Sequence, residues 1–504
     1  MSSAMQKEAA EAQENTGYGD HSATSNALKI KEIPGSCGIP FVSPFLDRLE
    51  YFYFKGQDKF FQSRIERYGS TVFRANMPPG PFMASNPRVI VVLDAKSFPV
   101  LFDNTKIEKK DVLYGTYIPS TKLTGNYRIC ANLDPSEPSH TKVKQFLFNL
   151  LASRKSEIVP AFRASFITPV FTKLESQIAS DGRSDFNKLN DHFALEFLCD
   201  AYFGTCPSKT GISLDTKAIM WLLPQLAPLA SKILAERFFP LWFLEDLLLH
   251  TFPIPSFLVK SQYKALYSYF ESVGAHAVDN IAAQIGLSRE EAINNLLYTT
   301  IFNAYGGFKV LFPIILKWLA SCGKHADLHA RIASEVRSAV GENGQLTITA
   351  LENMDLVKSV VYEALRIEPP VPYQYGHAKK DFVLENHDAA FLVRKGEMIF
   401  GYQPFATTDS RVFGSDAQTF VPDRFVGDDG KLLKYLCWSN GPETEDPTVG
   451  NKQCAGKNFV VLVSRLLVAE LFLRYDSFTA EASKISLGAQ VTFTDVTKAK
   501  PKLA

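Results

Sequence analysis

Cys454 has the type and the setting of a metal ligand. It lies near the C-terminal end of the chain, in the run Asn-Lys-Gln-Cys-Ala-Gly at 451–456. A cysteine thiolate is a strong anionic donor for iron. Gly456, two residues further on, lets the backbone approach a flat ligand closely where a side chain would clash. The chain has 7 cysteines, so the surrounding loop is what singles this one out.

One carboxylate and two arginines upstream of this loop could position it. Glu363 and Arg366 lie three residues apart on one face of an expected helix, and Arg424 follows in the run Pro-Asp-Arg-Phe at 422–425. An arginine guanidinium is a planar fork that can donate two hydrogen bonds to one carboxylate. Taken alone, Glu-x-x-Arg is more often a surface pair on a helix. The residues by themselves leave a surface pair and a buried network open.

A late cysteine two residues before a glycine, with Glu-x-x-Arg upstream, resembles the haem-thiolate enzymes of the cytochrome P-450 superfamily. The positions at which this chain departs from the superfamily pattern point to one family within the superfamily. Nine extra residues, 442–450, follow the aromatic-x-x-Gly run at 438–441, and Lys452 stands where the superfamily has arginine. This insertion resembles the family of allene oxide synthases and hydroperoxide lyases. Further runs of that family stand at 115–120, 302–307 and 369–371, within a resemblance from about residue 33 to 498.

The resemblance implies a fold, a cofactor and a reaction. The fold would be α+β, a mainly helical haem-thiolate fold with small β-sheets near the N- and C-terminal parts. Cys454 would hold haem b through an axial thiolate, while Glu363, Arg366 and Arg424 would form a triad that locks the cysteine loop to the core. The substrate would be a 13- or 9-hydroperoxide of linoleic or linolenic acid. A hydroperoxide dehydratase, a lyase of oxylipin (jasmonate-precursor) biosynthesis, would convert it to an allene oxide without dioxygen or a reductase.

The segment 306–310, Gly-Gly-Phe-Lys-Val, aligns with the motif by which oxygen-activating relatives relay protons, Ala/Gly-Gly-x-Asp/Glu-Thr. The acid has become Lys309 and the hydroxyl residue has become Val310. Valine cannot relay a proton, and lysine lacks the carboxylate that does so in the relatives. The sequence therefore indicates that the substrate brings its own activated oxygen. A simpler explanation of the two glycines is tight packing between helices, because glycine in a helix interior costs about 1 kcal/mol.

Asn303, one helical turn upstream, is the candidate for handling the peroxide. A side-chain amide can both donate and accept hydrogen bonds. The resemblance implies that Asn303 holds the hydroperoxide oxygens over the iron, and that Leu113 and Phe308 line the fatty chain. The alternative for Asn303 is a hydrogen bond to the backbone of its own helix.

Leu113 bears on which product forms. It aligns with a pocket position that is often phenylalanine in allene oxide synthases and leucine in hydroperoxide lyases. An aromatic face could stabilise an electron-poor carbon, which leucine cannot do. Ala304 also looks lyase-like, whereas the runs 116–125 and 134–138 look synthase-like. Allene oxide synthase is the preferred prediction, with hydroperoxide lyase (short-chain aldehydes) and divinyl ether or epoxyalcohol synthase as alternatives.

Basic residues are candidates for contacts to the haem propionates, which are anions and favour basic donors. The resemblance supports Lys109 and Lys452. His140 and Lys144 lie four residues apart on one helix face, and an exposed pair is an equally good explanation for them.

Composition and periodicity outline the rest of the molecule. The chain has 504 residues, is 46% hydrophobic and carries a net charge of +1, which allows a large core and does not favour a nucleic-acid partner. We expect one catalytic domain over residues 31–504. Its expected elements are a helix at 45–68, strands at 71–73, 82–84 and 89–93, a mainly helical stretch from 140 to about 365, strands between 382 and 400, and a helix at 457–475.

The N-terminal segment, 1–30, reads as a disordered polar leader. It has no apolar stretch of a secretory signal or membrane anchor, and its acidic residues argue against a transit peptide. A cytoplasmic or plastid-associated protein is expected. The apolar segment 238–258 is interrupted by Glu245, Asp246 and His250, which favours a core or channel segment over a membrane span. Peripheral contact with a membrane surface stays open.

Two other classes of function remain as alternatives. One is a haem-binding sensor or carrier without turnover. The other is a conventional monooxygenase, against which Lys309 and Val310 argue, and which dependence on NADPH would reveal.

Overall fold

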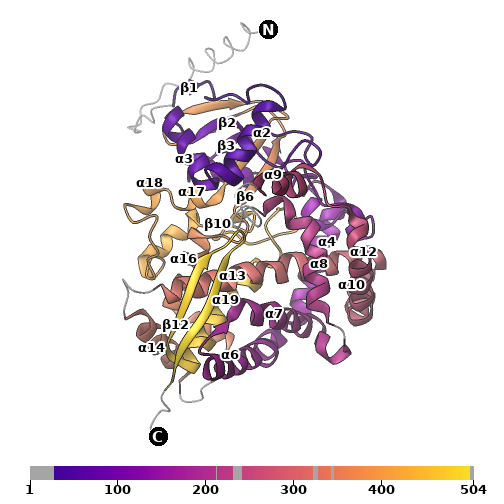
Figure 1. Cartoon of the computed structure of the whole chain (residues 1–504), viewed down its shortest axis with the longest axis vertical. Helices are drawn as coiled ribbons and strands as arrows, with labels where there is room; N and C mark the ends of the chain where they lie inside the picture. The colour runs from indigo at the N-terminus through magenta and orange to yellow at the C-terminus, as the bar shows by residue number, and fades with distance from the viewer. Residues whose placement is uncertain (1–27, 212, 231–240, 322–326, 342–344, 500–504) are drawn as a thin grey trace, which may run out of the picture.

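A computed structural model describes residues 28–211, 213–230, 241–321, 327–341 and 345–499. The first 27 residues of the expected leader lie outside them. Helices dominate, with small sheets formed by the N-terminal segment and by the C-terminal half (Figure 1). The predicted class, a mainly helical α+β fold with small sheets, is confirmed.

The largest sheet joins the two ends of the chain. Its five strands run in the order β2-β3-β9-β6-β4. Strand β3 pairs in parallel with β9, with Ile90 opposite Ile399, and β6 pairs antiparallel with β9. Pairing between segments so distant in sequence supports the single domain expected over 31–504. The strands are β2 (Val72–Asn76), β3 (Arg88–Val92), β4 (Ile107–Glu108), β6 (Tyr373–Ala378) and β9 (Met398–Tyr402).

Three smaller sheets complete the β-structure. Long antiparallel strands β12 and β13 lie beside the central helices (Figure 1). A two-stranded hairpin, β10–β11, precedes Cys454. The strands are β1 (Ile30–Lys31), β5 (Ser184–Asp185), β7 (Phe382–Glu385), β8 (Ala390–Val393), β10 (Cys437–Trp438), β11 (Gly441–Pro442), β12 (Tyr475–Lys484) and β13 (Ala489–Lys498).

The helices surround one large apolar core. The longer ones are α2 (Val42–Leu49), α3 (Gln57–Tyr68), α4 (Pro138–Ser153), α6 (Thr168–Asp181), α7 (Phe186–Phe203), α8 (Leu214–Leu226), α10 (Lys260–Val273), α12 (Arg289–Tyr298), α13 (Gly306–Ala320), α14 (Leu328–Val340), α16 (Asp355–Ile367) and α19 (Lys457–Arg474). Short α-helices are α5 (Ile158–Phe162), α9 (Trp242–Glu245), α11 (Ala275–Ala277), α15 (Ile348–Glu352), α17 (Gln403–Thr407) and α18 (Ser410–Phe413). Five π-helical segments are η1 (Glu50–Phe54), η6 (Arg163–Ile167), η10 (Asp246–Thr251), η12 (Val278–Ala282) and η13 (Thr299–Tyr305).

The run α12–η13–α13 crosses the middle of the molecule. Arg289–Ala320 is long and apolar enough to span a bilayer, yet 61% of its most apolar window is buried within the protein. Leu311, Phe312 and Ile315 are fully or almost fully buried. It is therefore the core helix of the fold, and its central turn is the π-helical segment η13. Such segments often occur at functional sites.

Two local predictions were wrong. The helix expected at 45–68 is split, because Gly56 adopts a left-handed φ of 79° between η1 and α3. The strand expected at 82–84 is a turn. Its chain folds back so that Met83 and Ala84 both donate backbone hydrogen bonds to the carbonyl of Gly80. Gly80 N in turn donates to His250 O at 2.8 Å, which fixes this turn against η10.

Candidate active site

Cys454 is held on a tight hairpin. The two residues that join β10 to β11, Ser439 and Asn440, have φ values of 60° and 64°. Two positive φ angles in a two-residue loop are the geometry of a type I′ turn. Cys454 N donates to Ser439 O at 2.9 Å, and Lys457 N donates to Cys454 O at 3.1 Å. The thiol therefore lies between this turn and the first residue of α19.

The surroundings of the Cys454 thiol have opposing effects on its pKa. Burial raises the pKa of Cys454, whereas the N–H of Gly456, the charge of Lys144 and the hydroxyl of Ser439 favour the thiolate and offset part of that effect. A thiol that coordinates a metal ion is deprotonated outright. A Cβ added at Gly456 would meet the sulfur at 3.8 Å, an ordinary contact, so close approach to the thiol alone does not require this glycine.

The long insertion before Cys454 packs as part of the site. Gln453 donates to Pro442 O at 2.9 Å, and a Cβ at Gly441 would come within 2.8 Å of the Gln453 amide nitrogen. Lys457 donates to the carbonyls of Glu443 and Glu445 at 2.5 and 2.6 Å. Sequence reasoning missed Gln453 and Lys457. Their amide and ammonium groups fix the insertion against the cysteine loop.

The structure places Glu363, Arg366 and Arg424 in one buried network. Arg366 donates to both oxygens of Glu363, at 2.6 and 2.7 Å, and Arg424 Nε donates to Glu363 Oε1 at 2.9 Å. The remaining Arg366 donors reach the carbonyls of Thr407, Ala417 and Thr419. Glu363 and Arg366 are fully buried, so the alternative of a surface pair is wrong. This network joins α16 to the chain that leads to the cysteine loop.

The four basic candidates, Lys109, His140, Lys144 and Lys452, are all buried or half-buried near the thiol. Lys452 donates to the carbonyls of Cys130, Ala131 and Leu133, and Lys144 donates to Asn451. Lys109 donates to Gln374 at 2.9 Å and Asn440 at 2.8 Å. His140 and Lys144 are not an exposed pair, since they are 0% and 2% exposed.

The lysine ammonium groups of this basic cluster form no ion pair among the described residues, although Asp134 lies nearby. Within the described chain, its three lysines pair with carbonyl and amide oxygens rather than with carboxylates. Both ring nitrogens of His140 are buried without a hydrogen-bond partner there. Burial, together with the charge of Lys452, lowers the pKa of Lys109 to about 7 and that of His140 to about 4. Buried ammonium groups without an ion-pair partner beside a thiol fit a metal cofactor that carries carboxylates, and haem has this composition.

The predicted wall opposite Cys454 is η13 and the start of α13. Asn303 is exposed, although Ile301, Ala304 and Tyr305 around it are buried. Within the described residues its side-chain amide makes no hydrogen bond, so the alternative of a bond to its own helix is not observed. A Cβ at Gly307 would meet nothing within 4 Å in the described structure, and one at Gly306 only Ile301 O at 3.5 Å. The glycines border open space rather than a tightly packed helix.

Lys309 and Val310 serve structural contacts. Lys309 pairs with Asp191 on α7, and Tyr305 donates to the carbonyl of the same residue at 2.9 Å. Val310 packs against Gly488 in the β12–β13 turn, where a Cβ would come within 3.2 Å of its Cα. The positions that relay protons in oxygen-activating relatives are thus occupied by a paired cation and a packed valine.

The structure does not bring Phe308 to the face that Asn303 presents. Phe308 is 1% exposed and its ring stacks on Phe312 at 4.5 Å, with Phe197 and Phe459 beside it. Its ring thus belongs to an aromatic part of the helical core, and its role in lining the fatty chain stays a prediction. Leu113 is half-buried and packs against the small cluster of Ala84, Tyr114 and Tyr117, which agrees better with a lining role.

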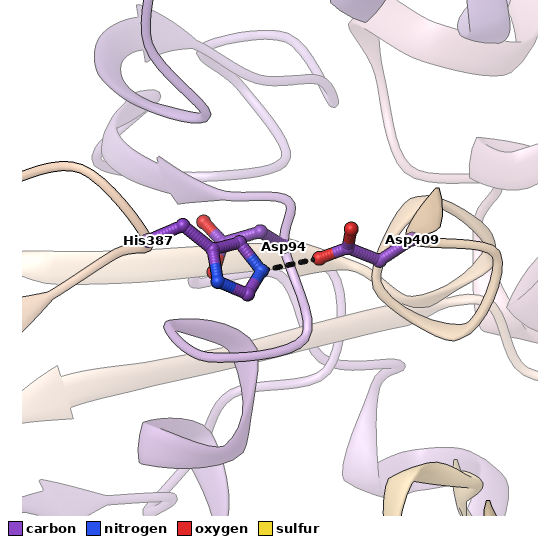
Figure 2. Close-up of side chains that lie close together, drawn as sticks. All are labelled: Asp94, His387 and Asp409. Carbon is purple, nitrogen blue, oxygen red and sulfur yellow. Dashed lines mark hydrogen bonds and ion pairs between the residues drawn. The ribbon is translucent and has the colours of Figure 1, made fainter. Parts of the chain in front are cut away.

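Another group of ligand-type side chains consists of Asp94, His387 and Asp409, whose ligand atoms lie within 4.8 Å of one another (Figure 2). His387 pairs with Asp409 at 2.7 Å. All four carboxylate oxygens already accept hydrogen bonds, mostly from backbone N–H groups of the turns that follow Asp94 and Asp409. The group therefore acts as a structural clamp between the N-terminal chain and the start of α18.

Comparison with known proteins agrees with this geometry. The family model described as Cytochrome P450 matches residues 82–487. The chain is 58% identical to Allene oxide synthase 2 of Oryza sativa subsp. japonica, over 94% of this chain and 97% of that protein. It is 52% identical to Allene oxide synthase, chloroplastic, of Arabidopsis thaliana (94% and 90%) and 51% identical to the protein of that name from Linum usitatissimum (94% and 87%). The chain belongs to the cytochrome P-450 family, and these relatives are named allene oxide synthases.

Proposed function

We propose that this chain is an allene oxide synthase, a hydroperoxide dehydratase that removes water from a polyunsaturated fatty-acid hydroperoxide in oxylipin biosynthesis. The observation that carries the proposal is the wall opposite Cys454. It offers a free amide at Asn303 and open space at Gly307, while the proton-relay positions hold Lys309 and Val310. Such a site can bind and orient a peroxide but has no group with which to protonate bound dioxygen.

The residues near the thiol fit haem b. Cys454 would be its axial ligand, Lys109, Lys144 and Lys452 would neutralise its propionates, and His140 would donate a hydrogen bond to one of them. When bound, haem supplies an iron able to cleave the O–O bond of the substrate. The Glu363 network holds the cysteine loop in place for this ligand. Because the reaction removes one water from the hydroperoxide and the peroxide is itself the oxidant, neither dioxygen nor a reductase is required.

Asn303 orients the peroxide group. Its amide has an N–H donor for the oxygen that departs as water and a carbonyl that accepts from the hydroperoxide O–H. The open space at Gly307, one turn further on, leaves room for the fatty chain, and by the family resemblance we assign Leu113 to the lining of the same chain. Our preferred substrates are the 13- and 9-hydroperoxides of linoleic and linolenic acid.

A second candidate is hydroperoxide lyase, which cleaves the chain to short aldehydes. Leu113 and Ala304 favour it, because neither provides the aromatic face or hydroxyl that is common in the synthases. Divinyl ether synthase and epoxyalcohol synthase are further alternatives with the same fold. The identity to several proteins named allene oxide synthase over 94% of the chain supports the dehydratase.

We also propose peripheral contact with a lipid surface. Helix α2 and the α9–η10 segment lie side by side, joined by the buried pair Arg48–Asp246 at 2.8 Å. Large apolar side chains are exposed on both: Phe41, Val42, Phe45, Leu46, Phe243, Leu244, Leu247 and Leu248. Part of the expected apolar segment, 238–240, lies outside the described residues. Sedimentation with phosphatidylcholine–phosphatidylglycerol vesicles tests this contact. Phe41→Ser with Leu247→Ser should abolish it, and Val383→Ser on exposed β7 should not.

Association with plastids is the location that we propose, since several relatives carry the word chloroplastic in their names. Fractionation of plant cells that express the full chain with a C-terminal tag tests it. Recovery in the plastid fraction is expected, and recovery only in the cytosol would contradict the proposal.

Product analysis tests the catalytic function. Purified haem-loaded protein is incubated with 13-hydroperoxy-octadecatrienoic acid without NADPH, and the products are identified by mass spectrometry. Ketols and cyclopentenone, formed from an unstable allene oxide, are the expected products. Short-chain aldehydes as the main products would make the chain a lyase. No consumption of the hydroperoxide would leave a haem-binding sensor or carrier.

A further inference from the structure

The loop that carries Leu113 has little regular structure of its own. It leaves the five-stranded sheet after β4 and reaches α4 about thirty residues later, with only short 3-10 turns between. Leu113 and Tyr114 pack against a small cluster that includes Ala84, Tyr117 and the partly buried Leu229. So small a contact area does not by itself fix a side chain. The position of Leu113 must be set largely at the base of the loop.

Arg128 holds the two ends of this loop together. Its Nε donates to Asp111 Oδ1 at 2.9 Å, and its Nη2 donates to the carbonyl of Asn132 at 2.7 Å. The same guanidinium makes two hydrogen bonds to Glu137, the residue that precedes α4. One rigid fork therefore ties the beginning of the loop, its end and the next helix together.

The backbone conformation of Asp111 depends on these hydrogen bonds. It lies two residues before Leu113 and has a left-handed φ of 51°. A non-glycine residue in this region is uncommon and is held there by its surroundings. Asp111 N donates to Asn132 O at 3.0 Å, so the backbone and the side chain of Asp111 are both fixed to the end of the loop. Release of the side chain would allow the backbone to relax and to move Leu113.

The site of haem is connected to the same base. Lys109 N donates to Asp134 Oδ2 at 2.7 Å, and Asp134 N donates to Glu137 Oε1 at 2.7 Å. Glu137 is therefore shared between Arg128 and the turn that holds the backbone of Lys109. These backbone hydrogen bonds do not depend on Arg128, so loss of Arg128 should disturb Leu113 more than the cofactor contacts.

We propose that Arg128 is a positioning residue that controls how the reaction divides between allene oxide and chain-cleavage products, by fixing Asp111 and through it Leu113. This inference rests on the proposed function and extends it to a residue outside the pocket. The hydrogen bonds of its guanidinium go to Asp111, Asn132 and Glu137, so we assign it an indirect role. Its effect is expected on the choice of product, because a shift of about 1 Å in a group beside a reacting centre can change a rate by up to about a hundredfold.

The test compares Arg128→Gln and Asp111→Asn with the unaltered enzyme and with Arg394→Gln. Asparagine tolerates a left-handed φ, so Asp111→Asn removes the charged partner while keeping the backbone favourable. Arg394 forms an exposed pair with Asp381 and is the matched control for loss of a surface arginine. Haem content, KM, kcat and the ratio of ketol to aldehyde are measured with the 13-hydroperoxide.

Both loop variants should keep the Soret band of the unaltered enzyme and change the ketol-to-aldehyde ratio several-fold in the same direction. The double variant of Arg128→Gln with Asp111→Asn should match Arg128→Gln, since the contact that Asp111→Asn weakens is already lost with Arg128. Arg394→Gln should leave the ratio unchanged. An unchanged ratio in Arg128→Gln, or one that falls together with haem content, would overturn the proposal. Failure of the unaltered enzyme to consume hydroperoxide would instead overturn the proposed function.

Discussion

The network that anchors the cysteine loop and the predicted opposite wall differ in how completely their polar groups are paired. On the Cys454 side, Glu363 and Arg366 are fully buried and fully hydrogen-bonded, and Lys457 anchors the insertion. On the opposite wall, the amide of Asn303 is free and a Cβ at Gly307 would meet no atom in the described structure. The paired network fixes the cysteine loop rigidly, as a permanently bound cofactor requires. The Asn303 wall keeps an unpaired amide and open space, as binding and release of a substrate require.

Loss of the thiol should have the largest effect. Cys454→Ala removes the proposed axial ligand, so we expect loss of the Soret band and of hydroperoxide consumption together. Absorbance spectra after haem loading, followed by the activity assay, measure both. Cys37→Ala changes a half-buried thiol outside the site and should leave both intact. An active Cys454 variant with a normal Soret band would show that another residue is the ligand.

Breaking the buried network should come next. Glu363→Gln leaves Arg366 and Arg424 buried without their carboxylate, and uncompensated buried charges of this kind destabilise by about 3–5 kcal/mol. Denaturant unfolding of the haem-loaded protein measures the change. Asp388→Asn removes one partner of the exposed pair with Arg411 and should cost no more than about 1 kcal/mol. Equal losses in the two variants would mean that the network does not support the cysteine loop.

Asn303→Ala probes the open wall. Removal of a single hydrogen-bond donor to reacting oxygens typically lowers a rate by about a hundredfold or more, and we expect such a loss in kcat with the Soret band unchanged. Steady-state kinetics on the 13-hydroperoxide measure it. Asn353→Ala, at an exposed asparagine after α15, is the control. If Asn303→Ala retained full kcat, the peroxide would be oriented by another group.

Leu113→Phe should give the smallest effect. The face of an aromatic ring attracts a positive centre by about 0.5–1 kcal/mol, and a similar stabilisation of an electron-poor carbon would shift the products a few-fold toward ketol. The ketol-to-aldehyde ratio measures the shift, with Val112→Ile as a control for added volume in the neighbouring buried position. A fall in the ketol share would exclude Leu113 from the product-determining wall.

The sequence predicted the parts of the site that carry a motif better than the parts that depend on tertiary packing. Cys454 and the Glu363 network carry unusual residue types at fixed spacing, so their motifs predicted the contacts that the structure shows. The hairpin beneath Cys454 was missed, because Ser439 and Asn440 adopt positive φ without the glycine that usually marks such turns. For Phe308 the sequence predicted a lining role that stays a prediction, since apolar character alone does not distinguish a pocket wall from the core. His140 and Lys144 looked as if they could be exposed, and only tertiary packing decides that they are buried.

Dependence on dioxygen tests the central claim most directly, that the substrate supplies the oxygen and the open wall only orients it. The rate of consumption of the 13-hydroperoxide by haem-loaded protein is measured without NADPH, under air and under argon. We predict equal rates and the same ketol product in both gases. A rate that required dioxygen and NADPH would contradict this account and make the chain a monooxygenase.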